Sequence, residues 1–103
     1  MLAHNVYFTL EDPTPPKIQG LIAACEKYLR PHPGVAFFAA GPRVPDLTRP
    51  VNEQDFHVGL HVIFESRKDH DRYQDAPLHH QFIAEQKGNW KHVRVFDSET
   101  VRH

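Results

Sequence analysis

Three side chains in this sequence could form a proton-transfer site: the phenol of Tyr73 and the imidazoles of His79 and His4. His4 alternates with Phe8 on one face of a predicted strand, and His79 shares a helical face with Phe82. Both imidazoles are therefore predicted to point into the space between a sheet and its helices. An imidazole and a phenol at one end of an apolar interior can exchange a proton with a bound molecule, or orient its carbonyl or hydroxyl group. We predict that His79 and Tyr73 are this catalytic pair, with His4 behind them.

The residues expected around this pair are mostly apolar, which favours a small-molecule pocket. The predicted substrate-binding residues are His4, Val6, Phe8, Val58, Leu60, Phe82 and Trp90. An interior space on the order of 300 Å³ would support ligand binding or catalysis. The alternative is that both polar groups are core residues, with His79 bonded to the backbone. A helix rotated so that His80 faces the sheet would exclude the pocket.

Histidine is unusually frequent, with nine in the chain, and this raises the question of a metal site. His57 and His61 lie four residues apart on a predicted strand, which separates their backbones by about 13 Å, too far to share one ion. His79 and His80 are helix neighbours that point about 100° apart. No metal site is therefore predicted. A site built across two copies of the chain from His57, His61 and His92 remains an alternative.

The other reactive or charged groups are interpreted as structural. Cys25 lies on the apolar face of a predicted helix and is expected to be a small buried hydrophobe. The mixed charges from Arg67 to Arg72 are typical of a solvated helix face. The sequence contains no phosphate-binding glycine loop, no Gly-x-Ser-x-Gly and no cysteine pair, so no cofactor is predicted.

The elements that must position these residues follow from periodicity and from turn residues. The predicted strands are residues 4–10, 35–40 and 56–64 and a last strand from Trp90 through Phe96; the predicted helices begin near Pro16, after Ser66 and at Pro77, and a surface loop spans 41–54. This order predicts an α+β fold: a ferredoxin-like β-α-β-β-α-β sandwich with an antiparallel sheet and helices on one face. At 103 residues, the chain is expected to form a single domain spanning 1–103.

The sheet face turned away from the helices is predicted to be half apolar. Its members are Asn5, Tyr7, His57, His61, Ile63, His92, Arg94 and Phe96. A second copy packed sheet to sheet would cover such a face. We therefore expect a homodimer that forms through Tyr7, His57, His61, Ile63 and Phe96. The alternative is a monomer with a semi-polar open face.

Composition excludes several partners. The formal net charge is −1, from 12 basic and 13 acidic residues, and 40% of the residues are hydrophobic. This balance gives no electrostatic footprint for nucleic acid or an anionic membrane. No apolar run approaches the length of a membrane span, and the N-terminus lacks the pattern of a signal peptide. With one cysteine, the chain has no intrachain disulfide, and the cytoplasm is the expected location.

Motifs along nearly the whole chain resemble those of the stress-responsive A/B barrel family (Dabb). The chain opens with a His4-x-Val6-x-Phe8 strand and closes with a strand from Trp90 to Asp97. Its most specific stretch runs from Asp69 to His79, where the Tyr-x-x-x-Pro-x-His pattern of the family falls on Tyr73, Pro77 and His79, with Gln74 also matching. The resemblance implies ferredoxin-like monomers that pair into a dimeric α/β barrel.

The resemblance also implies a type of chemistry. One plant member, olivetolic acid cyclase, closes a polyketide ring by aldol condensation without a cofactor, and its catalytic tyrosine and histidine fall on Tyr73 and His79. The histidine that lines its pocket from the first strand falls on His4. This chain differs where that enzyme has two further histidines, with Ala76 and Val58 in their places.

We therefore expect a small dimeric protein that binds a small apolar or aromatic molecule, with cyclase- or isomerase-like acid/base chemistry. His79 would be the general base, Tyr73 would stabilise the developing oxyanion, and His4 would orient the substrate or His79. One alternative is a non-catalytic structural or stress-related homodimer. Another, by fold analogy, is a cofactor-free monooxygenase.

Overall fold

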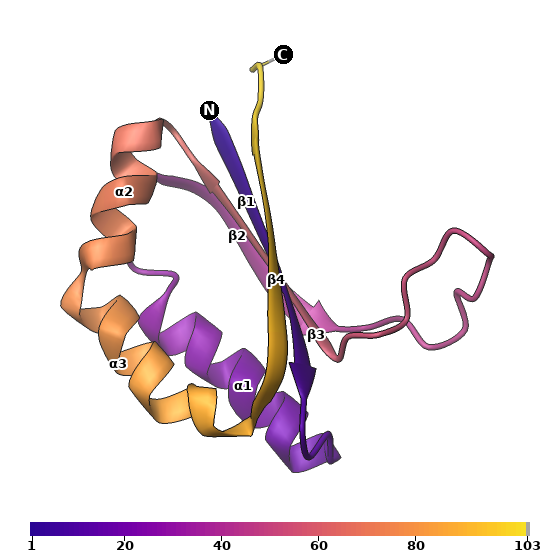
Figure 1. Ribbon diagram of the computed structural model, residues 1–103. Helices are drawn as coiled ribbons and strands as arrows, with labels where there is room; N and C mark the ends of the chain where they lie inside the picture. The colour runs from indigo at the N-terminus through magenta and orange to yellow at the C-terminus, as the bar shows by residue number, and fades with distance from the viewer. Residues whose placement is uncertain (103) are drawn as a thin grey trace.

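The computed structural model describes residues 1–102 and has a four-stranded antiparallel sheet with helices packed on one face (Figure 1). Its elements are β1 (Leu2–Leu10), α1 (Pro15–Tyr28), β2 (Val35–Pro42), β3 (Val58–Phe64), α2 (Arg67–Asp75), α3 (Pro77–Gln86), a short 3₁₀ helix (Lys87–Asn89) and β4 (Trp90–Glu99). The predicted ferredoxin-like α+β fold is confirmed. Among residues 1–102, every helix is too short or too polar to cross a membrane.

The strand order β2-β3-β1-β4 places β1 inside the sheet, between β3 and β4. His4 on β1 lies opposite Val62 on β3 and opposite Asp97 on β4. Directly opposed residues of an antiparallel pair point to the same face. This register therefore brings the Asp97 side chain beside His4, on the face that the helices cover.

The core lies between that face and the three helices. It is built from alternate residues of β1 and β3, such as Phe8 and Leu60, and from the apolar face of α1. Cys25 on α1 is fully buried, as predicted, and burial raises the pKa of its thiol to about 12. This thiol is therefore a packing group and is not ionised near neutral pH.

Local sequence fixes the corner between α2 and α3, which carries two candidate site residues. Ser66 caps α2, and its Oγ accepts a hydrogen bond from the Asp69 backbone N–H at 3.2 Å. Ala76, the residue before Pro77, is extended and ends α2, and Pro77 is the first residue of α3. Ser66 and Pro77 therefore act as the sequence predicted, and they set how Tyr73 and His79 approach each other.

Most element ends lie within two residues of prediction, but the start of β3 changes the environment of His57. β3 begins at Val58 instead of Phe56, and the preceding segment folds across the open face of the sheet. There the hydroxyl of Thr9 donates to the Asp55 carbonyl at 2.7 Å, and the Phe56 ring packs against Tyr7. The strand begins late because the backbone before it satisfies polar groups on the open face. His57 consequently lies outside β3, and its Nδ1 accepts a hydrogen bond from the Leu10 backbone N–H at 2.9 Å.

The rest of the open face remains exposed. The loop between β2 and β3 extends from the sheet on the side away from the helices (Figure 1). Phe96 is 55% exposed and Phe37 is 57% exposed, and Phe37 shares this face because it lies opposite Ile63. The alternation of the last strand predicts Phe96 on this face, whereas Phe37 is not predicted there. The exposed face is thus more aromatic than predicted.

Candidate active site

A cavity of about 170 Å³ lies between the sheet and the helices, at the Tyr73–His79 corner. Its lining residues are His4, Val6, Phe8, Leu29, Leu60, Tyr73, Gln74, His79, Phe82, Ile83, Trp90, Val93 and Val95. The structure thus brings eight predicted site residues to one cavity. It does not bring Val58, which is fully buried in the core one pleat away from Leu60. The cavity is smaller than the space on the order of 300 Å³ that the ligand-binding interpretation anticipated.

Tyr73 and His79 face each other across the break between α2 and α3. Their ring centroids are 4.8 Å apart with the planes at 67°, an edge-on contact. Tyr73 is 2% exposed and His79 is 9% exposed, whereas His80 lies on the exposed side of α3. The helix is therefore rotated as the pocket prediction requires.

The Nδ1 atom of His79 is buried and has no hydrogen-bond partner among the described residues. It is therefore not satisfied by a backbone group, as the structural alternative would require. Burial, with repulsion from the other histidines around it, lowers the pKa of His79 to about 4. The imidazole is neutral near pH 7 and has a lone pair available for a proton or a donor.

The hydroxyl of Tyr73 has the complementary character. Burial, with a smaller contribution from the neighbouring Cys25, raises the pKa of this phenol far above its ordinary value. Tyr73 therefore stays protonated near neutral pH and can donate a hydrogen bond there. A neutral base and a phenol donor thus meet at the wall of one apolar cavity.

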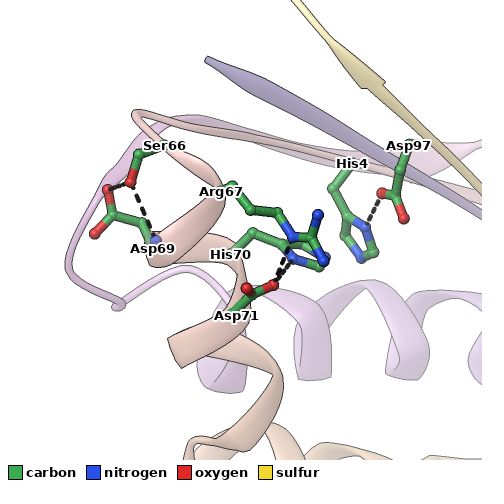
Figure 2. A network of polar contacts seen from close by, with 7 residues as sticks. All are labelled: His4, Ser66, Arg67, Asp69, His70, Asp71 and Asp97. Carbon is green, nitrogen blue, oxygen red and sulfur yellow. Dashed lines mark hydrogen bonds and ion pairs between the residues drawn. The ribbon is translucent and has the colours of Figure 1, made fainter.

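His4 is held by a carboxylate that the sequence analysis did not identify. Its Nδ1–H donates to Oδ1 of Asp97 at 2.6 Å (Figure 2). Burial lowers the pKa of His4, and the Asp97 carboxylate partly opposes this effect. The bond fixes the tautomer, so that Nε2 carries the lone pair. The alternation of Val93 and Val95 continues to Asp97, and this pattern could have placed the carboxylate on the helix-covered face.

His70 corrects the interpretation of the charged segment from Arg67 to Arg72 as a solvated face. Its side chain is 14% exposed and its ring packs edge-on against Phe64 and His4, with centroids 5.5 Å and 5.1 Å away. The available signal was its position three residues before Tyr73, which places both side chains on one helix face. The charged neighbours obscured that relationship.

The three histidines predicted on the open face each have a separate partner. His61 donates to Oδ1 of Asn5 at 2.8 Å, and the hydroxyl of Thr9 lies 3.1 Å from Nε2 of His92. His57 accepts a hydrogen bond from the Leu10 backbone N–H. Within residues 1–102, the side chains close enough to share a metal ion are instead His4, His70 and Asp97. The alternative metal site built across two copies of the chain from His57, His61 and His92 stays a prediction, because it needs donors from both copies.

Comparison with known families identifies the chain's relatives. The sequence model of the stress responsive A/B barrel domain (Dabb) matches residues 2–100. The chain belongs to this family. No curated protein sequence matches it.

Solved structures show the same fold in proteins related to this Dabb chain at low sequence identity. A protein from Arabidopsis thaliana has a TM-score of 0.81 and 21% identity, covering 100% of this chain and 98% of its own. A dimeric ferredoxin-like protein of unknown function from Thermobifida fusca has a TM-score of 0.79 and 17% identity, with coverage of 96% and 90%. A hydroxynitrile lyase from Passiflora edulis has a TM-score of 0.74 and 19% identity, with coverage of 98% and 96%. These comparisons support the fold assignment across nearly all of the chain.

Proposed function

We propose that this Dabb protein binds a small, largely apolar carbonyl compound in the cavity and transfers a proton at the carbon next to the carbonyl. The observation that carries the proposal is the buried Nδ1 of His79, which lacks a protein partner beside an apolar cavity and Tyr73. An unsatisfied buried polar atom is costly unless it gains a partner. A bound molecule that presents an acidic C–H group would interact with this base.

In the proposed step, neutral His79 takes the proton from the α-carbon, and the electron pair moves to the carbonyl oxygen. The Tyr73 hydroxyl donates a hydrogen bond to that oxygen as negative charge develops. His4, held by Asp97, orients the bound molecule or His79. Return of the proton to a different carbon gives isomerisation, and attack of the carbanion on a second carbonyl closes a ring. These proposed reaction steps need no cofactor.

The size and walls of the cavity restrict the substrate. An apolar cavity of about 150 Å³ can hold benzene, so this cavity of about 170 Å³ accommodates a single six-membered ring. Larger molecules would extend past Val93 and Val95, which are partly exposed on the edge strand β4. The preferred substrate is therefore an aryl or short alkyl ketone, or an aldehyde. A relative named as a lyase supports the idea that this fold can host chemistry at a small substrate.

The test combines ligand binding with proton exchange. Thermal unfolding of the full chain and of His79→Ala is followed alone and with small aromatic and keto acids and phenylacetone. A ligand at a hundredfold its Kd should stabilise the parent protein by about 2.7 kcal/mol. Exchange of the α-protons of phenylacetone in D₂O, followed by NMR, should be accelerated by the parent protein and not by His79→Ala.

His80→Ala is the matched control, because it removes an exposed imidazole from the next position on the same helix. It should keep both the ligand-induced shift and the exchange. No shift with any compound, together with a loss of stability in His79→Ala, would make His79 a core residue.

The second candidate is a homodimer in which the open sheet face is the functional surface. The exposed rings of Phe96 and Phe37 favour it, because such a face is costly to leave in water. The Thermobifida fusca relative is described as dimeric. We propose that two copies pair through this face, with Tyr7, His61, Ile63 and Phe96 in the interface. His57, now outside β3, would lie at its margin.

A further inference from the structure

Three donor side chains from distant parts of the chain meet beside the cavity. His4 comes from β1, His70 from α2 and Asp97 from β4, and Figure 2 shows them gathered between the helix and the sheet. One donor atom from each lies within 4.8 Å of the other two. Imidazole nitrogen and carboxylate oxygen are donors that transition metals such as zinc prefer.

His70 is arranged as a metal ligand would be. Its Nδ1–H donates to Oδ1 of Asp71 at 3.0 Å, so the lone pair of the neutral ring lies on Nε2. That Nε2 is buried and has no hydrogen-bond partner among the described residues. Metal-binding histidines commonly donate their second ring N–H to a carboxylate, which orients the ring and increases its basicity. Asp71 provides such a carboxylate.

His4 and Asp97 supply the other two donors. The His4 ring is buried and lies 5.1 Å from the His70 ring, measured between centroids. Its Nδ1 lies 2.6 Å from Oδ1 of Asp97, whose side chain is 44% exposed. An ion can therefore approach from solvent on the Asp97 side, and this exposed carboxylate can adjust its position without disturbing the core. For both residues to bind one ion, the ion takes the place of the Nδ1 proton, which moves to Nε2 of the same neutral ring.

The geometry requires only a small closure. Metal–ligand bonds of 2.0–2.2 Å in a tetrahedral arrangement place the donor atoms about 3.4 Å apart. The donor atoms now lie within 4.8 Å of one another, so side-chain movements of about 1–1.5 Å would bring them to this spacing. Three protein ligands leave a fourth coordination position open.

The local charge also favours a cation. Asp97 and Asp71 bring two negative charges, and Arg67 offsets one of them through its 2.9 Å bond to Asp71. The remaining negative charge lies on Asp97, directly among the donors. Neutral His4 and His70 add lone pairs without adding positive charge.

We propose that His4, His70 and Asp97 bind a divalent transition-metal ion of the zinc class, with Asp71 as the carboxylate that positions His70. Two nitrogens and one oxygen suit zinc better than magnesium or calcium, which prefer all-oxygen sites. The sequence predicts no metal site, because His57 and His61 are too far apart on their strand and His70 belongs to a segment interpreted as solvated. The site is separate from the Tyr73–His79 pair and shares only His4 with the lining of the cavity.

The test titrates the full chain, produced without a histidine tag and treated with chelator, with Co²⁺ at pH 7.5. Tetrahedral Co²⁺ absorbs visible light strongly, so the spectrum reports both binding and geometry. We expect one equivalent of Co²⁺ to bind and to be displaced by one equivalent of Zn²⁺. His70→Gln and Asp97→Asn should each weaken binding at least a hundredfold. Asp71→Asn should weaken Co²⁺ binding by about 10- to 100-fold, as expected for a carboxylate that orients a metal-binding histidine without contacting the ion.

His92→Gln is the control, because it removes a histidine on the opposite face of the sheet. It should bind Co²⁺ as the parent chain does. The chelated variants are compared by circular dichroism, so that a lost fold is distinguished from a lost ligand. Absence of stoichiometric Co²⁺ binding, or binding that survives His70→Gln and is lost in His92→Gln, would overturn the proposal. Neither readout involves a small-molecule substrate, so this test fails or succeeds independently of the proposed proton transfer.

Discussion

The ring of His79 meets the ring of Tyr73 edge-on at 4.8 Å, although a helix break separates the two residues. Pro77 produces this approach, because it stops α2 through Ala76 and begins α3. His79 therefore reaches the end of the cavity at which the last turn of α2 presents Tyr73. The pairing depends on the corner between two helices and not on either helix alone.

Tyr73→Phe should separate the chemical role of the phenol from its packing role. The ring stays, so the edge-on contact with His79 is kept and the free energy of unfolding should change by about 1 kcal/mol or less. Loss of the donor to the carbonyl oxygen should slow α-proton exchange of phenylacetone by about a hundredfold or more. The measurement is NMR exchange beside chemical denaturation of both proteins. Unchanged exchange would exclude Tyr73 from the reaction.

The free energy of unfolding should decrease as the pH is lowered, partly because of His79. Its pKa is about 4 in the folded chain, against 6.5 for the free side chain, so the unfolded chain binds a proton more readily between these values. Folding is therefore destabilised as the pH falls through this window. From pH 7 to pH 4.5, His79 should account for a loss of roughly 2 kcal/mol in the parent chain.

The comparison variant for this pH effect is His79→Gln, which cannot titrate. Burial also lowers the pKa of His4 and His61, but both residues remain in both proteins and their effects cancel in the difference. Urea denaturation at the two pH values should therefore show a smaller loss in the variant. Equal losses would mean that His79 is protonated as easily in the folded chain as in the unfolded one.

Two glycines offer a matched test of backbone strain at the turn that packs against the start of α2. Gly34 has a φ of +83°, and a Cβ there would overlap the side chain of Asp69 in the first turn of α2. Gly34→Ala should therefore destabilise the fold by about 1–3 kcal/mol. Gly20 lies inside α1 with open space around it, so Gly20→Ala should stabilise by about 0.5–1 kcal/mol. Thermal and urea unfolding measure both, and equal effects would contradict the strain at Gly34.

The Tyr73–His79 pair could be predicted because its determinants are local. The spacing of His79 and Phe82 sets the face of α3, and Pro77 marks where that helix begins. The alternation of His4, Val6 and Phe8 sets the buried face of β1 in the same way. Each inference needs only a few neighbouring residues, so none depends on how distant segments pair.

The contacts of Asp97 and His70 are not set by local pattern alone. The contact of Asp97 with His4 depends on the register of β1 against β4, which joins residues 93 positions apart. His70 lies among charged residues, and its burial depends on contact with Phe64 across α2 and β3. The volume of the cavity depends on how all the surrounding side chains pack, which no periodicity encodes.

Phe96→Asp should convert the proposed dimer to a monomer. The parent chain should have a mass near twice 11.9 kDa by light scattering or sedimentation. A carboxylate at a 55% exposed ring position would be buried without a partner in a sheet-to-sheet interface, whereas in the monomer it stays in water. Val101→Asp is the control, because Val101 is 77% exposed and lies beyond the end of β4, so it should leave the mass unchanged. A Phe96→Asp protein that stays dimeric would place the interface elsewhere, and a parent chain of 11.9 kDa would leave the open face in water.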